Sequence, residues 1–288
     1  MYKKIHAQFK GKNKYLMHLW TDDGGYEQVE WWNTAYQECS KDEATHRGIH
    51  DEPLKKVYKY EKNQLGLHFG DMPAHQKFLI EKYGTNDKPS TGHREVFFDI
   101  EIEMGDALTV EYIESAPKKV TSIAWWDKQL DEWGIVILDP KNQIEEKKEG
   151  NRHIIPCRTE QGLLATFIEK YKQIDPDILI GYNSDYFDIP YLYYRICKIL
   201  GPEWGNELSP IGQVQSKATS DVWYYRDCYV RIAGIQSLDY IRLHKKYSWA
   251  DEPSWKLDAI GEKYVGKGKI EYDGSLDRLF EEDIEKFM

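Results

Sequence analysis

Three carboxylates alternate with apolar residues in the segment from Val96 to Glu103. Successive side chains of a β-strand point to opposite faces, so Asp99, Glu101 and Glu103 would share one face, and the other would carry Val96, Phe98, Ile100 and Ile102. Like charges two residues apart repel mildly, and a bound divalent cation would replace that repulsion with coordination. The segment predicts a metal-binding strand or, if this face only meets water, an ordinary amphipathic strand.

A second polar group follows the apolar run at residues 177–182. Asn183 falls in the turn after this run. Asp188 falls at the start of a helix that has Pro190 in its first turn, where a missing N–H costs nothing. Either residue could serve a site. Aspartate also caps helices and asparagine also favours turns, so the local roles of helix cap and turn residue remain open.

The elements that would position these side chains alternate between strand and helix patterns, which predicts an α/β domain with a central sheet. We interpret residues 139–152, which include a run of five charged residues, as a solvated loop. The expected strands are Val96–Glu103, Val120–Trp126, Ile135–Leu138 and Asp177–Tyr182, and the expected helices are Thr159–Tyr171 and Ile189–Leu200.

The beginning of the chain has a different pattern. Aromatic-rich runs at Tyr15–Trp20 and Tyr26–Trp32 flank the glycine-containing turn at residues 21–25, which predicts a β-hairpin in a small β-rich domain. Pro73–Tyr83 follows as a predicted helix. Turn-forming residues then fill positions 84–92 with no apolar residue among them. We therefore predict one domain at residues 1–92 and a second at residues 93–288.

Composition excludes several classes of protein. The 288 residues are 41% hydrophobic and 14% aromatic, which indicates folded domains rather than disorder. A net charge of −10 argues against a protein that coats nucleic acid, because such binding depends on lysine and arginine neutralising phosphates. No stretch approaches the roughly 20 apolar residues that span a bilayer, so we expect no membrane association.

The cysteines give no sign of a metal site or of disulfide bonds. They lie far apart, without a CxxC pair or a histidine at zinc spacing. This usage suggests a reducing, cytoplasmic setting. The four residues are Cys39, Cys157, Cys197 and Cys228.

Taken together, the two polar segments resemble the exonuclease domain of family B DNA polymerases. Phe98–Glu101 resembles that family's first exonuclease motif, and Gly181–Asn183 with Phe187–Asp188 resembles the second. Residues 253–269 are similar to the helix and basic loop that precede the third motif. The long stretch at residues 201–235 looks closest to polymerases of T-even-type bacteriophages. The resemblance covers the chain from Arg94 onward, and the N-terminal region only by position and β-rich character.

The resemblance implies a ribonuclease-H-like exonuclease domain that removes mispaired nucleotides from a single-stranded 3′ end during DNA replication. It also implies two divalent metal ions, Mg²⁺ or Mn²⁺, at one carboxylate cluster. By motif position, Asp99 would hold the metals, Glu101 would bind one metal and orient the attacking water, and Asp188 would complete the cluster. Asn183 would bind the terminal nucleotide. Phe187 would form a wall for base or sugar, or belong to the core.

The family's third motif, Tyr-x-x-x-Asp on a helix, does not occur in its expected context. Tyr247 and Asp251 have the spacing but lie in an apparent loop before Pro253, so we interpret them as a coincidence. The polymerase's own aspartate motifs are also absent, so we expect no DNA synthesis. The polymerase portion would lie in the same chain or in a second one.

An alternative function is a non-catalytic DNA- or RNA-binding or regulatory module. Aromatic side chains of the N-terminal region could stack on bases, although we favour ordinary strand packing for them; they include Trp31, Trp32, Tyr58 and Tyr60. A ribonuclease or transposase of the same fold would not readily explain residues 253–269. Basic residues near the C-terminus could follow a DNA strand or simply form a solvated face, and they are Lys245, Lys246, Lys256, Lys263, Lys267 and Lys269.

Overall fold

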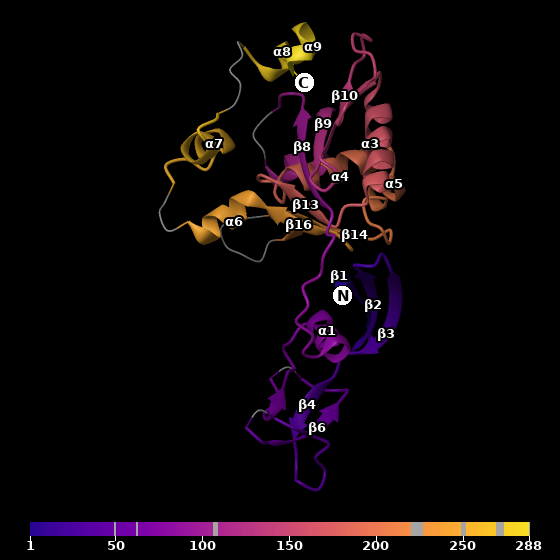
Figure 1. Ribbon diagram of the computed structural model, residues 1–288, viewed down its shortest axis with the longest axis vertical. Helices are drawn as coiled ribbons and strands as arrows, with labels where there is room; N and C mark the ends of the chain where they lie inside the picture. The colour runs from indigo at the N-terminus through magenta and orange to yellow at the C-terminus, as the bar shows by residue number, and fades with distance from the viewer. Residues whose placement is uncertain are drawn as a thin grey trace. The chain divides into compact units, whose positions relative to one another are not determined.

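Figure 1 shows the computed structural model of the chain, which describes residues 1–48, 50–61, 63–105, 109–219, 227–248, 252–268 and 274–287. For residues 217–219 and 227–229 only the backbone is described. The chain divides into two compact units, residues 1–93 and residues 94–288. The boundary predicted after residue 92 therefore lies one position away. Among the described helices, none is long and apolar enough to cross a membrane.

The first unit contains two antiparallel sheets and one helix. The three-stranded sheet has the order β1-β2-β3, with strands at Tyr2–Gly11, Lys14–Thr21 and Tyr26–Trp32. The four-stranded sheet has the order β5-β6-β4-β7, with β4 at Ala35–Glu38, β5 at His46–Arg47, β6 at Pro53–Val57 and β7 at Leu67–His68. The predicted hairpin is thus confirmed as β2 and β3.

Helix α1 (Ala74–Tyr83) packs against the three-stranded sheet. Its Ala74 and Phe78 are buried with Met17 and Leu19 of β2, because these residues present apolar side chains on facing sides. The ring of Trp31 meets Phe78 edge to face, with centroids 6.1 Å apart. Strand packing therefore accounts for Trp31, one of the aromatic residues considered as base-stacking candidates.

The second unit is built on a seven-stranded mixed sheet with the order β11-β12-β10-β9-β8-β13-β16. The antiparallel pairs are β8 with β9, β9 with β10, and β11 with β12; the parallel pairs are β10 with β12, β8 with β13, and β13 with β16. The strands are β8 (Glu95–Ile102), β9 (Val120–Asp127), β10 (Glu132–Leu138), β11 (Lys147–Glu149), β12 (Arg152–Cys157), β13 (Ile178–Gly181) and β16 (Gln236–Asp239).

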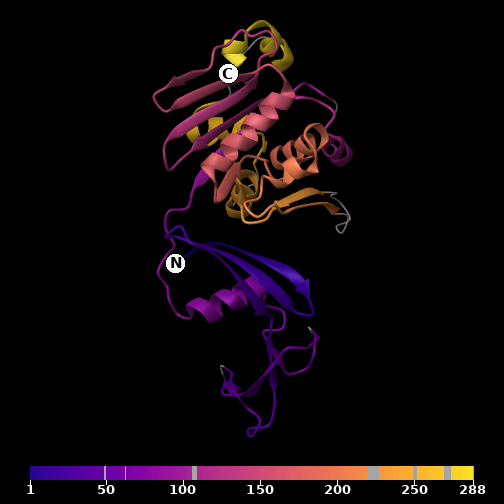
Figure 2. The same cartoon turned by 90° about the vertical axis from the view of Figure 1, so that its right-hand side faces the viewer.

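Two helices, α3 (Glu160–Ile174) and α4 (Asp188–Ile199), cover one face of this sheet, and Figure 2 shows α3 lying across the strands. Helix α3 starts where expected because the side chain of Thr159 accepts a hydrogen bond from the backbone N–H of Gly162. The predicted α/β domain and the expected helices are confirmed, with bounds that differ by one to three residues at their ends.

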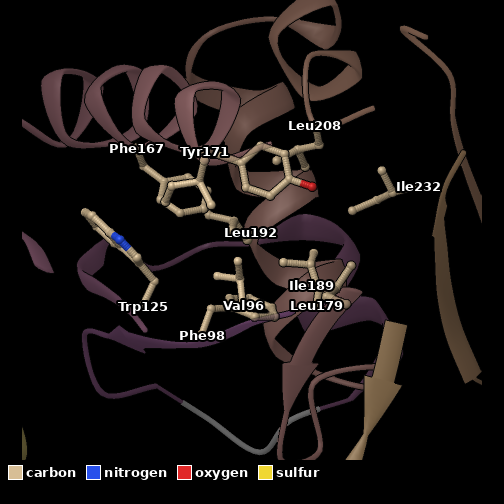
Figure 3. A pocket seen from close by; sticks show the side chains of 11 residues that line it. Val96, Phe98, Trp125, Phe167, Tyr171, Leu179, Ile189, Leu192, Leu208 and Ile232 are labelled. Atoms are coloured by element: carbon tan, nitrogen blue, oxygen red, sulfur yellow. The ribbon is translucent and has the colours of Figure 1, made fainter. Parts of the chain in front are cut away.

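A small void lies in this core beside the central strands, and Figure 3 shows it from close by. Its volume is about 20 Å³, and apolar side chains line it, among them Phe98, Trp125, Phe167 and Leu179. Figure 3 draws two polar atoms near it, the hydroxyl oxygen of Tyr171 and the indole nitrogen of Trp125, but only apolar atoms line the void itself. Because a buried water needs two or more polar partners, the void should be dry.

The prediction of a solvated loop at residues 139–152 was wrong in part. Residues Lys147–Glu149 form strand β11, which pairs with the start of β12 at the edge of the sheet. All three side chains of β11 are exposed, so the sequence shows no alternation of apolar and polar residues. Charged side chains of this kind are common on edge strands, where they discourage pairing with other chains.

The stretch at residues 201–235 contains α5 (Pro202–Asn206) and a separate two-stranded antiparallel sheet of β14 (Val214–Thr219) and β15 (Asp227–Ile232). The remaining helices are α2 (Val110–Ser115), α6 (Tyr240–Tyr247), α7 (Leu257–Val265), α8 (Leu276–Glu282) and α9 (Ile284–Phe287). Helix α7 falls within residues 253–269, where the family resemblance predicted a helix. Among the cysteines whose side chains are described, Cys39, Cys157 and Cys197 are free thiols.

Candidate functional site

Strand β8 presents its carboxylates as the alternation predicts. Val96, Phe98 and Ile100 are buried against α3 and α4, while Asp99 is exposed on the opposite face and Glu101 is half-buried. The residues directly opposite these two acids on β9 are small: Asp99 pairs with Ala124 and Glu101 with Ser122. Because cross-strand neighbours set the room around a side chain, these small partners crowd the two carboxylates little.

Strand β13 and the loop after it bring Asp188 to the same place. Strand β13 runs parallel to β8, with Ile180 opposite Phe97, and ends at Gly181, one position later. Beyond this point the edge of β8 is open, and α4 begins there with Asp188. The Oδ1 atom of Asp188 accepts a hydrogen bond from the backbone N–H of Ile100, 3.2 Å away. The helix start is therefore tied to the residue between Asp99 and Glu101.

Asp188 does not cap α4. Phe187 occupies the cap position and makes no side-chain cap hydrogen bond, and Asp188 is the first residue of the helix proper. Its side chain points into the protein, and only 3% of its surface is exposed. The local alternative, in which Asp188 serves as an ordinary helix cap, is therefore wrong.

Burial and the charge of Asp99 raise the pKa of Asp188 to about 8, and the charge of Glu101 adds a smaller effect in the same direction. The hydrogen bond from Ile100 acts in the opposite sense because it favours the ionised form. A carboxyl that resists ionisation beside two others is a common feature of functional sites, and a cation at this position would allow all three to ionise.

The donor set suits a hard divalent cation, since Mg²⁺ and Mn²⁺ prefer carboxylate oxygens. Among the described residues, however, no three histidine, cysteine, aspartate or glutamate side chains lie close enough together to hold one ion. The three carboxylates act on one another electrostatically, but they do not form a closed coordination shell by themselves.

The other two predicted residues lie in the loop between β13 and α4. Asn183 is half-buried and has a left-handed backbone conformation, with φ of 64°. Asparagine tolerates this conformation better than most residues, so the predicted turn role is confirmed. Phe187 is also half-buried. Its ring centre is 5.5 Å from that of Tyr191, so it packs on the core. This contact favours the core role that we gave as the alternative for Phe187.

Asp239 is a residue that the sequence interpretation missed. It ends strand β16, is 4% exposed, and accepts hydrogen bonds from the backbone N–H groups of Asn183 and Asp185. The available signal was an aspartate directly before the amphipathic segment that forms α6, which is a typical helix-cap position. The four residues of β16 carry too little apolar pattern to predict a strand.

The residues considered as a third motif do not form one within the described chain. Tyr247 is the last residue of α6 and is 66% exposed, and Asp251 lies outside the described residues. The predicted basic residues Lys245, Lys246, Lys256, Lys263 and Lys267 are all exposed on or beside α6 and α7, and Lys269 lies outside the described residues. Three of the five have local partners: Lys245 lies over the ring of Trp255, Lys246 lies over the ring of Tyr247, and Lys263 pairs with Glu252.

Comparison with known proteins identifies the family. A model of the exonuclease domain of DNA polymerase family B matches residues 79–260. The chain is 35% identical over 164 residues to the DNA-directed DNA polymerase of Escherichia phage RB69, which is 55% of this chain and 18% of that protein. It is 31% identical over 169 residues to the DNA-directed DNA polymerase of Enterobacteria phage T4, which is 58% of this chain and 18% of that protein.

A shorter match extends to archaea. The chain is 46% identical over 44 residues to DNA polymerase 2 of Aeropyrum pernix, which is 15% of this chain and 5% of that protein. The matched region covers less than a fifth of the length of each phage polymerase. The expected resemblance is thus confirmed over the region that contains both polar segments, and the chain belongs to the exonuclease domain family of the family B DNA polymerases.

Proposed function

We propose that this chain is the 3′→5′ proofreading exonuclease portion of a DNA-directed DNA polymerase. The observation that carries the proposal is the position of Asp188, whose buried carboxylate lies within electrostatic reach of Asp99 and Glu101 and is held against the strand that bears them. The substrate would be the single-stranded 3′ end of DNA. The polymerase portion, in the same chain or a second one, would be the partner that supplies this end.

The reaction is hydrolysis of the last phosphodiester bond. A water molecule gives up a proton as its oxygen bonds to phosphorus, the bond from phosphorus to the 3′ oxygen of the preceding nucleotide breaks, and the released 3′ oxygen takes up a proton. Two divalent metal ions, when bound, would lower the pKa of the water and stabilise the leaving oxygen. Asp99 and Asp188 would hold the ions, Glu101 would also orient the water, and Asn183 would contact the terminal nucleotide. No covalent enzyme intermediate is needed.

The test uses 5′-labelled single-stranded DNA with Mg²⁺ or Mn²⁺. We expect stepwise shortening from the 3′ end by the native chain, and its loss in the Asp99→Ala/Glu101→Ala variant. Glu103→Gln is the matched control, because Glu103 follows β8 on the same alternation and pairs with Lys119 rather than joining the site. Shortening that persists in the double variant, or no shortening by the native chain together with no Mn²⁺ binding, would contradict the proposal.

A hollow in the first unit favours binding of a nucleic-acid strand as a second candidate function. It has a volume of about 270 Å³ and lies between the four-stranded sheet and α1. Aromatic, apolar and cationic side chains line this hollow. The lining residues are Thr34, Tyr36, His46, Arg47, Leu54, Phe69, Met72, Lys77, Ile80 and Glu81.

Lys77 gives this hollow its chemical character. Its side chain is buried, and its ammonium donates to the backbone carbonyl of Thr34 at 2.7 Å and to the hydroxyl of Tyr60 at 3.4 Å. Burial lowers the pKa of Lys77. It makes no ion pair with a carboxylate in the described chain, and the charges of Asp71 and Glu81 offset only part of the cost of its burial, so an anion beside it would be favourable. The phosphate of a bound nucleotide would supply this negative charge, and its base could stack on the aromatic side chains of the lining.

Oligonucleotide binding by Lys77→Met tests this second candidate. Affinity for single-stranded DNA and RNA should fall at least several-fold in Lys77→Met, measured at one salt concentration by fluorescence anisotropy. Lys82→Met is the matched control, since Lys82 lies on the same helix and pairs with Glu27 outside the hollow. Equal losses in both variants would indicate a general effect of charge and would exclude the hollow as a strand-binding site.

A further inference from the structure

The carboxylate of Asp239 lies beneath the loop that carries Asn183 and leads to Asp188. Strands β13 and β16 are parallel, and Gly181 is opposite Asp239 at their ends. One oxygen of Asp239 accepts the backbone N–H groups of Asn183, at 2.9 Å, and of Ile241, at 3.0 Å. The other oxygen accepts the N–H of Asp185 at 3.3 Å. A single buried carboxylate thus binds the loop on one side and caps α6 on the other.

The hydrogen bonds continue from this loop directly into α4. The carbonyl oxygen of Asn183 accepts the N–H groups of Tyr186, at 3.1 Å, and Phe187, at 3.0 Å. The carbonyl oxygen of Ser184 accepts the N–H of Ile189 at 3.0 Å. Since Asp188 lies between Phe187 and Ile189, its position follows from the position of the loop. A continuous set of backbone hydrogen bonds therefore connects the amides that Asp239 binds to the start of α4, where Asp188 lies.

A side-chain network holds the same loop at a second point. The carboxylate of Asp185 accepts a hydrogen bond from the hydroxyl of Ser237, in strand β16, and pairs with the guanidinium of Arg242 at 2.9 Å. Arg242 also lies over the ring of Tyr186, 5.9 Å from its centroid. Strand β16 and the first turn of α6 therefore contact the loop through both backbone and side-chain groups.

The far end of the loop is fixed to strand β8. The carboxylate of Asp188 accepts the N–H of Ile100, which lies between Asp99 and Glu101. The loop is therefore held from β16 at one end, through Asp239, and from β8 at the other, through Asp188.

We propose that Asp239 is a positioning residue of the carboxylate site: by binding the amides of Asn183 and Asp185 it fixes the loop that places Asp188 beside Asp99. This inference rests on the proposed function. It differs from a purely structural role, in which Asp239 would matter only as the cap of α6. The two roles use different hydrogen bonds and can be separated by substitution.

Asp239→Ser separates the two roles. Serine is a good helix cap, so the bond to the N–H of Ile241 can be kept, but its short side chain cannot reach the amides of both Asn183 and Asp185. Asp177→Ser is the matched control. Asp177 is also 4% exposed, precedes the same strand β13 at its opposite end, and accepts the backbone N–H of Arg94 at 2.9 Å.

Two measurements on the full chain decide the question. Hydrogen exchange of the metal-free protein should be about tenfold faster or more at the amides of residues 183–187 in Asp239→Ser, with residues 242–247 unchanged. The dissociation constant for Mn²⁺ alone should rise by about 10–100-fold, the usual cost of losing a group that orients ligands. Asp177→Ser should lower the melting temperature without either effect.

Loop amides that stay as protected in Asp239→Ser as in the native chain would overturn the inference. An equal loss of Mn²⁺ affinity in Asp177→Ser would overturn it too, since general destabilisation would then explain both. If the native chain binds no Mn²⁺, the proposed function fails. Exchange then decides the role of Asp239: faster exchange confined to residues 183–187 supports its positioning role, and unchanged exchange refutes it.

Discussion

The carboxylate of Asp188 accepts a hydrogen bond from the backbone N–H of Ile100, which lies between Asp99 and Glu101 on strand β8. The two partners are 88 positions apart in the sequence. This contact ties the start of a helix to the middle of a strand, and it turns two separate polar segments into one group of carboxylates. Asp188 is buried, and the charge of Asp99 disfavours its ionisation. Changes at Asp188 should therefore affect both the stability of the second unit and its proposed chemistry.

We predict that, in the absence of metal, the Asp188→Asn variant becomes increasingly more stable than the native chain as pH rises. The pKa of Asp188 is raised from 3.8 to about 8, so between these values the folded chain keeps a proton that the unfolded chain releases. Stability from this group is therefore present at low pH and is lost toward pH 8. Asparagine does not titrate and can still accept from Ile100. With metal ions chelated, the melting temperature of the variant should rise relative to that of the native chain between pH 5 and 8. Melting temperatures that change with pH in the same way for both proteins would refute the prediction.

We predict that Glu160→Gln destabilises the second unit strongly. Glu160 and Arg195 form a buried two-point ion pair, with nitrogen–oxygen distances of 2.7 and 2.6 Å. Arg195 also donates to the carbonyls of Ala116 and Pro117, but without Glu160 its charge is buried without a counter-charge, which typically costs about 3–5 kcal/mol. Urea denaturation followed by circular dichroism measures the loss. As a control, Arg278→Ala breaks the exposed pair with Glu282 and should cost less than about 1 kcal/mol. Similar losses in both variants would be inconsistent with this view.

Two buried tyrosines should respond in opposite ways to the same change. The hydroxyl of Tyr171 has no partner among the described residues, so Tyr171→Phe should leave stability unchanged or raise it by up to about 1 kcal/mol. The hydroxyl of Tyr191 donates to the carbonyl of Lys118 at 2.8 Å and accepts its N–H at 2.9 Å. Tyr191→Phe should therefore cost about 1–2 kcal/mol in urea denaturation. A clear loss in Tyr171→Phe would mean that its hydroxyl has a partner after all.

Acid should loosen the contact between α6 and α7. Glu252 is buried between them, and hydrogen bonds from Lys263 and Tyr264 lower its pKa to about 2. Because the folded pKa lies below the ordinary value of 4.5, this group contributes stability above pH 4.5 that is lost as pH falls toward 2.

The fluorescence of Trp255, whose ring lies 5.5 Å from that of His244, can report this change. With the other tryptophans replaced by phenylalanine, we expect a transition between pH 4.5 and 2 that is absent in Glu252→Gln. A transition of the same size in the variant would assign the acid response to other groups.

Local pattern was enough to predict much of the second unit. Alternation placed Asp99 and Glu101 on one face of β8, and the order of strands and helices gave the α/β class. The paired motifs gave the family. Pattern failed where it carries little information: β11 is entirely charged, β16 has only four residues, and the aromatic runs of the first unit do not distinguish packing from binding.

The sequence by itself determined which residues could do chemistry and which face of their strand they occupy, because side-chain periodicity is a local property of the backbone. Only the tertiary structure decided that Asp188 is buried beside Asp99 rather than capping its helix. It also decided that Asp239 lies beneath the loop that leads from β13 to Asp188. These facts depend on the parallel pairing of β8, β13 and β16. Pairing between distant strands is set by burial of the whole core, which no short segment encodes.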